Sequence, residues 1–332
     1  MILIDALFIA NEGGGPALLR YLVDTIRQHK LEKEFYLLLD ARFTHDVSGF
    51  QHEHLRGSLI GRYRFYKNNL TRFSKVFCFA NTPPPIRCKV PSATYFHNIL
   101  LIESDKHPFR KGFWGAYLRF QFVKLFNKNT DEYIVQTSHM VEAIVGSHLK
   151  KKEHCKTFPF FKIADAELET TARANEFVYV STPTFYKNYE NLFGAWEILF
   201  EKGQKPVLHV TIDELSPALQ QKAKNLSDRG INIINHGYTD PRPLYQKCKY
   251  LVYPSYYESF GLGLVEGARA GMKVLAANLP YVTSVVVPSA SFDPGSAEDI
   301  ANTVMRALEE DLPDTVVCVE DRVDDLIGFL LN

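Results

Sequence analysis

The chain has 332 residues, of which 46% are apolar and 23% are charged, and its formal net charge is zero. This length predicts two domains, because a single domain usually has on the order of 100–200 residues. The composition is typical of a folded protein and excludes a disordered chain, and no segment approaches the roughly 20 consecutive apolar residues of a membrane-spanning helix.

The charges are divided unevenly along the chain. Residues 1–170 contain 24 Lys and Arg against 17 Asp and Glu, whereas residues 171–332 contain 14 against 21. Either the first half binds an anionic partner, or two oppositely charged lobes attract each other. The basic residues form no recognised nucleic-acid-binding motif, so we expect no nucleic-acid partner.

The five cysteines favour a reducing compartment. They are odd in number, scattered and without a CxxC pair, so they predict neither a disulfide framework nor a zinc site. The apolar N-terminus, MILIDALFIA, has no basic flank and no cleavage site, and we interpret it as a core strand and not as a signal peptide. We therefore expect a cytoplasmic protein, with a peripheral position at the inner membrane face left open.

The first half alternates between predicted strands and helices. A strand at residues 2–9 is followed by a glycine loop at residues 11–15 and by a helix whose first turn contains Pro16. The alternation is typical of a parallel, doubly wound sheet. Further strands are predicted at residues 35–39, 76–79, 93–96 and 132–135.

Residues 109–129 mix aromatic and basic side chains and contain no acid. A helix of this composition can lie on an anionic membrane surface. It can equally pack on a sheet with a solvated basic face, and the spread of aromatic residues around the helix favours this second interpretation.

Residues 150–173 read as a boundary, and a second alternating unit follows. We therefore predict an α/β fold with two Rossmann-like domains, at residues 1–160 and 161–332. The predicted strands of the second unit lie at residues 177–180, 206–211, 231–234, 250–253, 273–276 and 291–292. Its predicted helices lie at residues 189–202, 217–229, 241–248, 263–270 and 297–310.

The stretch YPSYYESFGLGLVEG, at residues 253–267, places Glu258 in a strand-to-helix loop and Glu266 about one turn into the helix. A hydrolytic pair needs carboxyls roughly 5–9.5 Å apart, which the intervening loop and turn make improbable. A metal site is disfavoured, because no His or Asp accompanies the two glutamates at ligand spacing. The remaining interpretation is that the two carboxylates bind an extended ligand, such as a nucleotide sugar, beyond the carboxyl end of the strand.

This stretch and its flanks resemble the E-x7-E signature of the retaining GT-B glycosyltransferases of family 4. The resemblance covers most of residues 177–310. It implies two Rossmann-like domains that face each other across a cleft, the first on the acceptor side and the second on the donor side. It also implies transfer of a sugar from a UDP- or GDP-sugar to an acceptor hydroxyl in polysaccharide or glycolipid assembly, without a metal or another cofactor.

Carried over to this chain, the resemblance implies that Glu258 contacts the donor sugar, that Lys187 binds the diphosphate and that Glu266 accepts from the ribose hydroxyls. The ordinary alternatives are a surface lysine for Lys187 and a first-turn acid that complements the helix dipole for Glu266. The other donor-binding positions that it implies in this half are Asn188, Tyr238, Ser259, Phe260, Gly261 and Leu262.

In the first half, His97 resembles the family's histidine that approaches the donor sugar, and the alternative is a core histidine. The loop of Gly13, Gly14 and Gly15 resembles the family's glycine loop near the diphosphate. The implied catalytic set is Glu258, His97 and Lys187.

Two positions depart from the family pattern. Asn98 replaces an acid, and Thr182 stands where the family has an arginine that clamps the diphosphate. Thr182 keeps a non-catalytic nucleotide-sugar-binding subunit open. A GT-B epimerase or phosphorylase is a separate alternative. The acceptor is expected to be a saccharide or a lipid-linked molecule, with contact to an anionic membrane as a further expectation.

Overall fold

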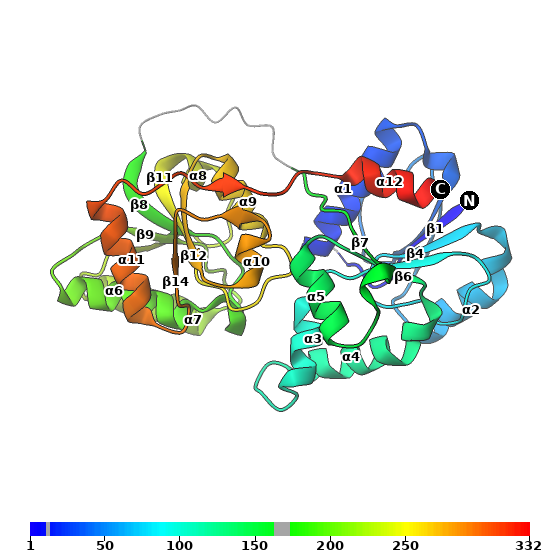
Figure 1. Ribbon diagram of the computed structural model, residues 1–332, viewed down its shortest axis with the longest axis horizontal. Helices are drawn as coiled ribbons and strands as arrows, with labels where there is room; N and C mark the ends of the chain where they lie inside the picture. Colours follow the sequence, from blue (N-terminus) through cyan, green and yellow to red (C-terminus); the bar gives the residue numbers. More distant parts are fainter. Residues whose placement is uncertain (11–13, 163–172) are drawn as a thin grey trace. The chain divides into compact units, whose positions relative to one another are not determined.

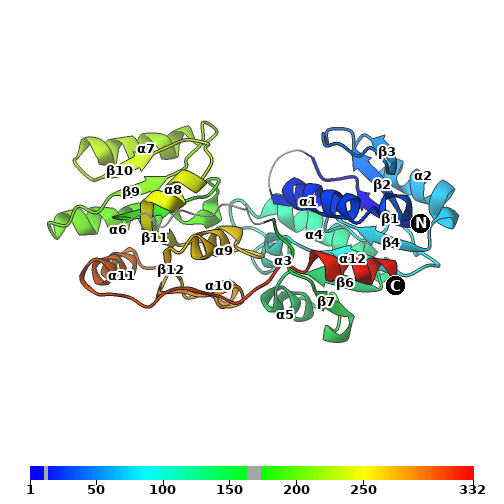
Figure 2. The same ribbon diagram turned by 90° about the horizontal axis from the view of Figure 1, so that it is seen from above.

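The computed structural model describes residues 1–10, 14–162 and 173–332 (Figure 1). The chain forms two compact units, one made of Met1–Lys162 with Glu320–Asn332 and the other of Ile163–Val319. Each unit is a parallel sheet with helices on both of its faces (Figure 2). The predicted α/β fold is confirmed.

Unit 1 contains a seven-stranded parallel sheet in the order β3-β2-β1-β4-β5-β6-β7. Its central strands are buried on both faces, as expected for a sheet covered by helices. The strands are β1 Ile2–Ala6, β2 Phe35–Asp40, β3 Gln51–Leu55, β4 Lys75–Cys78, β5 Ser92–Tyr95, β6 Glu132–Val135 and β7 Cys155–Thr157. The helices are α1 Gly14–Gln28, α2 Leu59–Asn69, α3 Ile99–Lys106, α4 Trp114–Phe126, α5 Ser138–Gly146 and α12 Val323–Leu331.

The C-terminal helix α12 belongs to unit 1. Its apolar residues Val323, Leu326, Ile327 and Leu330 lie in the same core cluster as the buried face of α1, and Arg322 N donates to Pro159 O at 2.7 Å. The sequence assigned residues 320–332 to the second domain, and the structure corrects this assignment. An apolar helix face is buried where a partner surface exists, which local sequence order does not reveal.

Unit 2 contains a six-stranded parallel sheet in the order β10-β9-β8-β11-β12-β14. The order reverses between β8 and β11, and open α/β sheets bind ligands beyond the carboxyl ends of the strands at such a point. The strands are β8 Ala174–Tyr179, β9 Leu208–Val210, β10 Ile233–Asn235, β11 Cys248–Tyr253, β12 Lys273–Ala277 and β14 Ala290–Phe292, and β13 Val286–Val287 pairs with β15 Val316–Val317. The helices are α6 Tyr189–Glu201, α7 Pro217–Asp228, α8 Arg242–Lys247, α9 Leu262–Arg269, α10 Pro280–Thr283 and α11 Ala297–Glu309.

Candidate active site

The glutamate stretch forms the predicted strand, loop and helix. Strand β11 ends at Tyr253, and α9 begins after Gly261, whose φ of 79° lies in the left-handed region. A side chain there would be strained, and its Cβ would lie 3.0 Å from Leu264 Cδ1. Gly267 lets α9 approach β11 closely, because a Cβ at this position would lie 2.6 Å from Leu251 Cδ2. Both glycines thus fix the start of α9 at the carboxyl end of β11.

Glu258 and Lys187 meet at the point where the strand order of unit 2 reverses. Lys187 ends the short 3-10 turn Phe185–Lys187 that follows β8, and Glu258 follows β11, the neighbouring strand. Lys187 Nζ lies 2.5 Å from Glu258 Oε1, and only 13% of each side chain is exposed. Tyr253 Oη donates to the same carboxylate oxygen at 3.1 Å. Two of the residues expected to be catalytic are therefore in direct contact.

Asn188 has a structural task beside Lys187. It adopts a left-handed conformation with φ of 58°, and its buried side-chain amide donates to Pro254 O at 3.0 Å and to Pro294 O at 2.7 Å. It thereby connects the segments that follow β8, β11 and β14. These contacts position the neighbouring lysine, while the predicted contact of Asn188 with a donor stays a prediction.

Glu266 lies in α9, about one turn from its start, as predicted. The carboxylate is half-buried, and Tyr245 Oη donates to its Oε2 at 3.3 Å. Burial, aided by the charge of Asp240, raises the pKa of Glu266 above its ordinary value. The carboxylate is thus partly desolvated and gains from further hydrogen-bond donors.

The other donor-binding positions differ in their exposure. Leu262 is the first residue of α9 and is partly exposed, whereas Phe260 is buried. Tyr238 is 92% exposed, and a side chain with this freedom can stack on a planar ring. Ser259 lies in the loop between β11 and α9. Their predicted contacts with a donor stay predictions.

In unit 1, His97 follows β5 and is clamped by Asn81. His97 N donates to Asn81 Oδ1 at 2.7 Å, which orients the Asn81 amide so that its Nδ2 donates to His97 Nε2 at 3.2 Å. Nε2 is therefore the acceptor, and the proton of the neutral ring lies on Nδ1. Among the described residues, this buried Nδ1 has no hydrogen-bond partner. Its N–H is therefore available to donate a hydrogen bond to an oxygen of a ligand.

His97 also lines a cavity of about 560 Å³ within unit 1, together with Gly15, Arg42, Arg119 and Phe122. A Cβ on Gly15 would lie 3.5 Å from His97 Nε2, so the structure brings Gly15 and His97 together. Gly14 begins α1. Gly13 lies outside the described residues.

The two departures from the family pattern have different structural consequences. Asn98 is the N-cap of α3, where its Oδ1 accepts from Leu100 N at 3.1 Å. Thr182, just after β8, is exposed. Sequence reasoning missed Tyr253, Tyr245 and Asn81, because each acts through a neighbour that only the folded chain brings near.

His97 should make folding stability depend on pH. Burial lowers the pKa of His97 to about 4 in the folded chain, against 6.5 ordinarily. Between pH 4 and 6.5 the unfolded chain therefore binds more protons than the folded chain. The free energy of unfolding has its full value above pH 6.5 and decreases by up to about 3 kcal/mol as the pH falls toward 4. Urea denaturation at both ends of this window should show a smaller pH effect in His97→Gln than in the wild type. The exposed-residue control His154→Gln should behave as the wild type, and equal slopes in all three proteins would contradict the assignment.

The sequence of the second unit is similar to known glycosyltransferases. A family model described as glycosyl transferases group 1 matches residues 161–320. The serotype-specific mannosyltransferase WbdA of Escherichia coli is 29% identical over 133 residues, which are 38% of this chain and 16% of that protein. The O-antigen chain mannosyltransferase B of Escherichia coli is 32% identical over 69 residues, 20% of this chain and 18% of that protein. The matched region thus spans less than a fifth of the length of these relatives.

Solved structures resemble the whole chain. A sucrose-phosphate synthase from Thermosynechococcus elongatus has a TM-score of 0.71 at 15% identity, over 93% of this chain and 90% of that one. The lipopolysaccharide outer core galactosyltransferase WaaB in its apo form has a TM-score of 0.65 at 14% identity, over 99% and 94%. Anabaena HepE in complex with UDP-glucose has a TM-score of 0.66 at 14% identity, over 93% and 89%. The two Rossmann-like units have the GT-B fold, and residues 161–320 match the glycosyl transferases group 1 family.

Proposed function

We propose that the protein transfers a sugar from a nucleotide diphosphate sugar to an acceptor hydroxyl, with retention of the anomeric configuration. The observation that carries this proposal is the contact of Lys187 with Glu258 beside the start of α9. It supports a site in which a sugar, a diphosphate and a ribose have separate partners along one loop and helix. The match of residues 161–320 to the glycosyl transferases group 1 model supports a nucleotide sugar as the ligand class.

The proposed mechanism is electrostatic. The Lys187 ammonium and the amides at the start of α9 stabilise the charge that grows on the diphosphate as the sugar becomes positively charged. Glu258 accepts from the sugar hydroxyls and keeps the ammonium in place, and Glu266 accepts from the ribose hydroxyls. The departing phosphate takes the proton of the acceptor on the same face of the sugar, so no covalent enzyme intermediate is needed. His97 Nδ1, for which the described part of the chain provides no hydrogen-bond partner, is proposed to donate to a hydroxyl of the donor sugar.

A thermal-shift screen against UDP, GDP, ADP and their sugars tests this function. A ligand that binds only the folded chain stabilises it by about 2.7 kcal/mol at 100 times its Kd. UDP-sugars are the first class to test, since HepE was solved with UDP-glucose. We expect one nucleotide sugar to raise the melting temperature and then to release its nucleotide when an acceptor is added. If no nucleotide sugar raises the melting temperature, the proposal is wrong.

The alternatives predict other products in the same assay. A non-catalytic binding subunit would be stabilised by the nucleotide sugar but would yield no product with any acceptor. An epimerase would change the sugar without an acceptor, and a phosphorylase would need inorganic phosphate. The exposed Thr182 in the place of the family's arginine is the observation that keeps the first alternative in view.

Binding of a nucleotide diphosphate should depend on pH through Glu266. Burial raises the pKa of Glu266 above 4.5, and ribose hydroxyls donate to the ionised carboxylate, so binding releases the proton. Affinity should increase as the pH rises from 4.5 through the raised pKa and then level off. In calorimetry, Glu266→Gln should bind about tenfold more weakly at neutral pH, since a hydrogen bond to a charged group contributes about 1.5–3 kcal/mol. It should also lose this pH dependence, and an unchanged dependence in the variant would contradict the role of Glu266.

The acceptor that we propose is lipid-linked and is taken at an anionic membrane surface. Helix α4 packs through the buried Phe120 and Val123, in agreement with the packed-helix interpretation. It also leaves large apolar side chains exposed beside its basic residues. These exposed side chains are Trp114, Leu118, Phe122 and Leu125.

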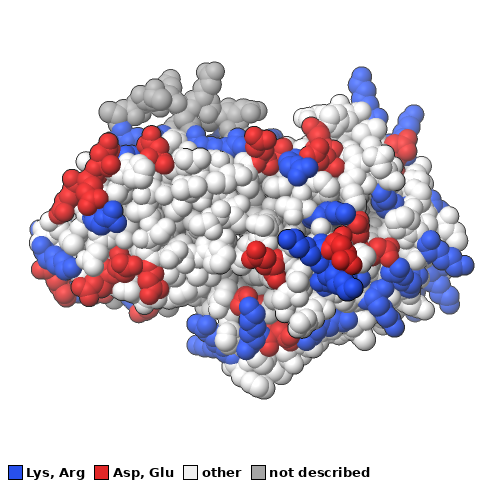
Figure 3. All heavy atoms as spheres, viewed as in Figure 1, with Lys and Arg blue, Asp and Glu red and all other residues white. Residues whose placement is uncertain are grey.

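Helix α2 also exposes apolar side chains, and its Leu59 lines the same cavity as Phe122 of α4. Leu59, Ile60 and Tyr63 of α2 are exposed, and Lys and Arg gather over the part of the face in Figure 3 that belongs to unit 1. Among the described residues, no helix is long and apolar enough to cross a membrane. The proposed contact is therefore peripheral, and a cytoplasmic location is proposed with it.

Leu125→Glu should weaken binding to anionic vesicles by about tenfold, because it removes apolar burial and adds a repelled charge. Cosedimentation with vesicles of phosphatidylglycerol and phosphatidylcholine at low and high salt measures the effect. The control Leu215→Glu changes a leucine that is 87% exposed in unit 2 and should bind as the wild type. Absence of wild-type binding at both salt concentrations would end the membrane proposal and leave the transfer reaction untouched.

A further inference from the structure

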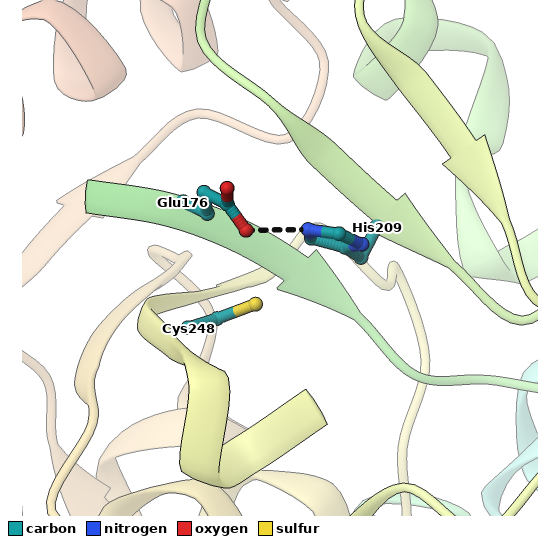
Figure 4. A group of neighbouring side chains, drawn as sticks. All are labelled: Glu176, His209 and Cys248. Carbon is teal, nitrogen blue, oxygen red and sulfur yellow. Dashed lines mark hydrogen bonds and ion pairs between the residues drawn. The ribbon is translucent and has the colours of Figure 1, made fainter. Parts of the chain in front are cut away.

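Three side chains with metal-binding atoms converge on the sheet of unit 2, apart from the residues used above. They are Glu176 on β8, His209 on β9 and Cys248 at the start of β11, and their ligand atoms all lie within 4.8 Å of one another (Figure 4). His209 is 1% exposed and Cys248 is 0% exposed. Cys248 is the first residue of β11 and the loop of Glu258 follows the last, so the two groups are separated by about 16 Å of strand, at about 3.3 Å per residue.

The pairing of β8 with β11 is irregular beside this group. Cys248 pairs with Ala174 and Tyr250 pairs with Phe177, so β8 advances by three residues where β11 advances by two. Glu176 lies within this bulge. In regular strands the side chains of Cys248 and Tyr250 would share a face, and bulges are known to redirect side chains. The bulge thus accompanies an arrangement that regular pairing would not give.

His209 has the second partner that ligand histidines usually have. Its Nδ1 lies 2.8 Å from His236 Nε2, and its Nε2 lies 2.8 Å from Glu176 Oε2. A histidine that binds a metal commonly donates its other N–H to a neighbouring acceptor, which fixes the tautomer and the ring orientation. In this structure Nε2–H of His209 donates to the Glu176 carboxylate, and Nδ1 accepts from His236. A metal bound at Nε2 would require the other tautomer, in which Nδ1–H donates to His236.

The group already holds a cationic side chain. Lys247 Nζ lies 2.9 Å from Glu176 Oε2 and 3.5 Å from His209 Nε2. Half of the Lys247 side chain is exposed, so the ammonium can leave toward solvent. Its departure opens a position that is accessible from water and beside the three ligand atoms.

We propose that Glu176, His209 and Cys248 bind one divalent transition metal of the zinc class, with water as the fourth ligand after Lys247 moves away. Nitrogen, sulfur and carboxylate oxygen are the ligands that zinc prefers, at about 2.0–2.3 Å. Tetrahedral bonds of this length place ligand atoms about 3.3–3.7 Å apart. The present separations, up to 4.8 Å, therefore need only small side-chain rotations.

Binding would release the thiol proton and connect several elements of the sheet. A metal binds the thiolate and not the thiol, so it would displace the Cys248 proton into solvent. The metal would join β8, β9 and the junction of α8 with β11. Because Tyr245 of α8 donates to Glu266, the metal would also stabilise the segment behind that carboxylate. The proposed role is structural.

Cobalt(II) added to the full chain after chelation and dialysis tests this site. We expect one Co²⁺ per chain, a thiolate-to-cobalt charge-transfer absorption band and a higher melting temperature. Cys248→Ser should lose the band and the shift in melting temperature. The matched control Cys318→Ser, at an exposed cysteine, should keep both.

A second variant separates a metal site from an ion-pair cluster even if Cys248→Ser folds poorly. Lys247→Met removes the competing ammonium and should tighten Co²⁺ binding by about tenfold, which is about 1.4 kcal/mol. If the group serves only as an ion-pair cluster, Lys247→Met will lower the melting temperature and bind no Co²⁺. Absence of the band in the wild type, or its persistence in Cys248→Ser, would overturn the proposal.

Discussion

Replacing Lys187 by alanine should lower kcat/KM for the nucleotide sugar by about 10²–10³, because removing one preorganised partner of transition-state charge typically has this effect. The ammonium lies 2.5 Å from Glu258 Oε1, and both side chains are mostly buried. Its loss removes the cation proposed to face the diphosphate and leaves the Glu258 carboxylate with the hydroxyl of Tyr253. Steady-state kinetics of Lys187→Ala, with circular dichroism to show that the chain is folded, measure the effect.

The control for this variant is Lys202→Ala. Lys202 forms an ion pair with Glu298 at 3.8 Å near the surface of the same unit, and its removal should change kcat/KM by less than about twofold, since exposed pairs contribute little. Glu258→Gln combined with Lys187→Ala should cost much less than the product of the two single effects, because the residues act as a unit. A change below about threefold in Lys187→Ala would remove this residue from the mechanism.

Replacing Arg62 by methionine should lower the free energy of unfolding by about 3–5 kcal/mol, because it leaves a buried carboxylate without its cation. Arg62 Nε donates to Asp5 Oδ2 at 2.7 Å, and the two side chains are 2% and 1% exposed. Tyr66 Oη donates to the same oxygen at 2.7 Å, and Arg62 also donates to Pro83 O at 2.8 Å. This network joins β1, α2 and the loop after β4 under the sheet of unit 1.

Chemical denaturation measures this prediction, with Arg87→Met as the control. Arg87 pairs with Asp131 at 2.5 Å, but 57% of its side chain is exposed, and its loss should cost at most about 1 kcal/mol. Arg62→Met combined with Asp5→Asn should recover part of the stability, because no buried charge is then left unpaired. Equal effects of Arg62→Met and Arg87→Met would show that the buried pair contributes no more than a surface pair.

The alternation of apolar runs and helical patterns predicted most of the fold. The central strands of both sheets were found because they are continuously apolar, as β1 and β2 are. Strands β3 and β7 were missed. Strand β3, QHEHL, is polar and lies at the edge of the sheet, and β7 has only three residues, so neither carries the apolar pattern of a central strand.

The candidate site was predictable where one loop carries it. Glu258, Gly261 and Glu266 are close in sequence, so a strand-to-helix turn places them without knowledge of distant contacts. The pairing of Lys187 with Glu258 and the clamp of Asn81 on His97 join residues from different strands. Such contacts follow from strand order, which the pattern of a single strand does not encode.

The proposed metal site could not be predicted from the sequence at all. Glu176, His209 and Cys248 come from three strands, and the sequence shows no ligand spacing that would connect them. Their proximity follows from the order β9-β8-β11 and from the bulge in β8. The cysteine count favoured no zinc site, because that inference considered only ligands close in sequence.

The most direct test of the proposed donor site is a crystal structure of the protein with the nucleotide sugar that the thermal-shift screen identifies. We expect Glu266 to accept from the ribose hydroxyls at about 2.6–3.2 Å, Glu258 to accept from the sugar, and Lys187 to face the diphosphate. A nucleotide sugar bound away from α9, or one from which both carboxylates turn away, would contradict the proposed donor site.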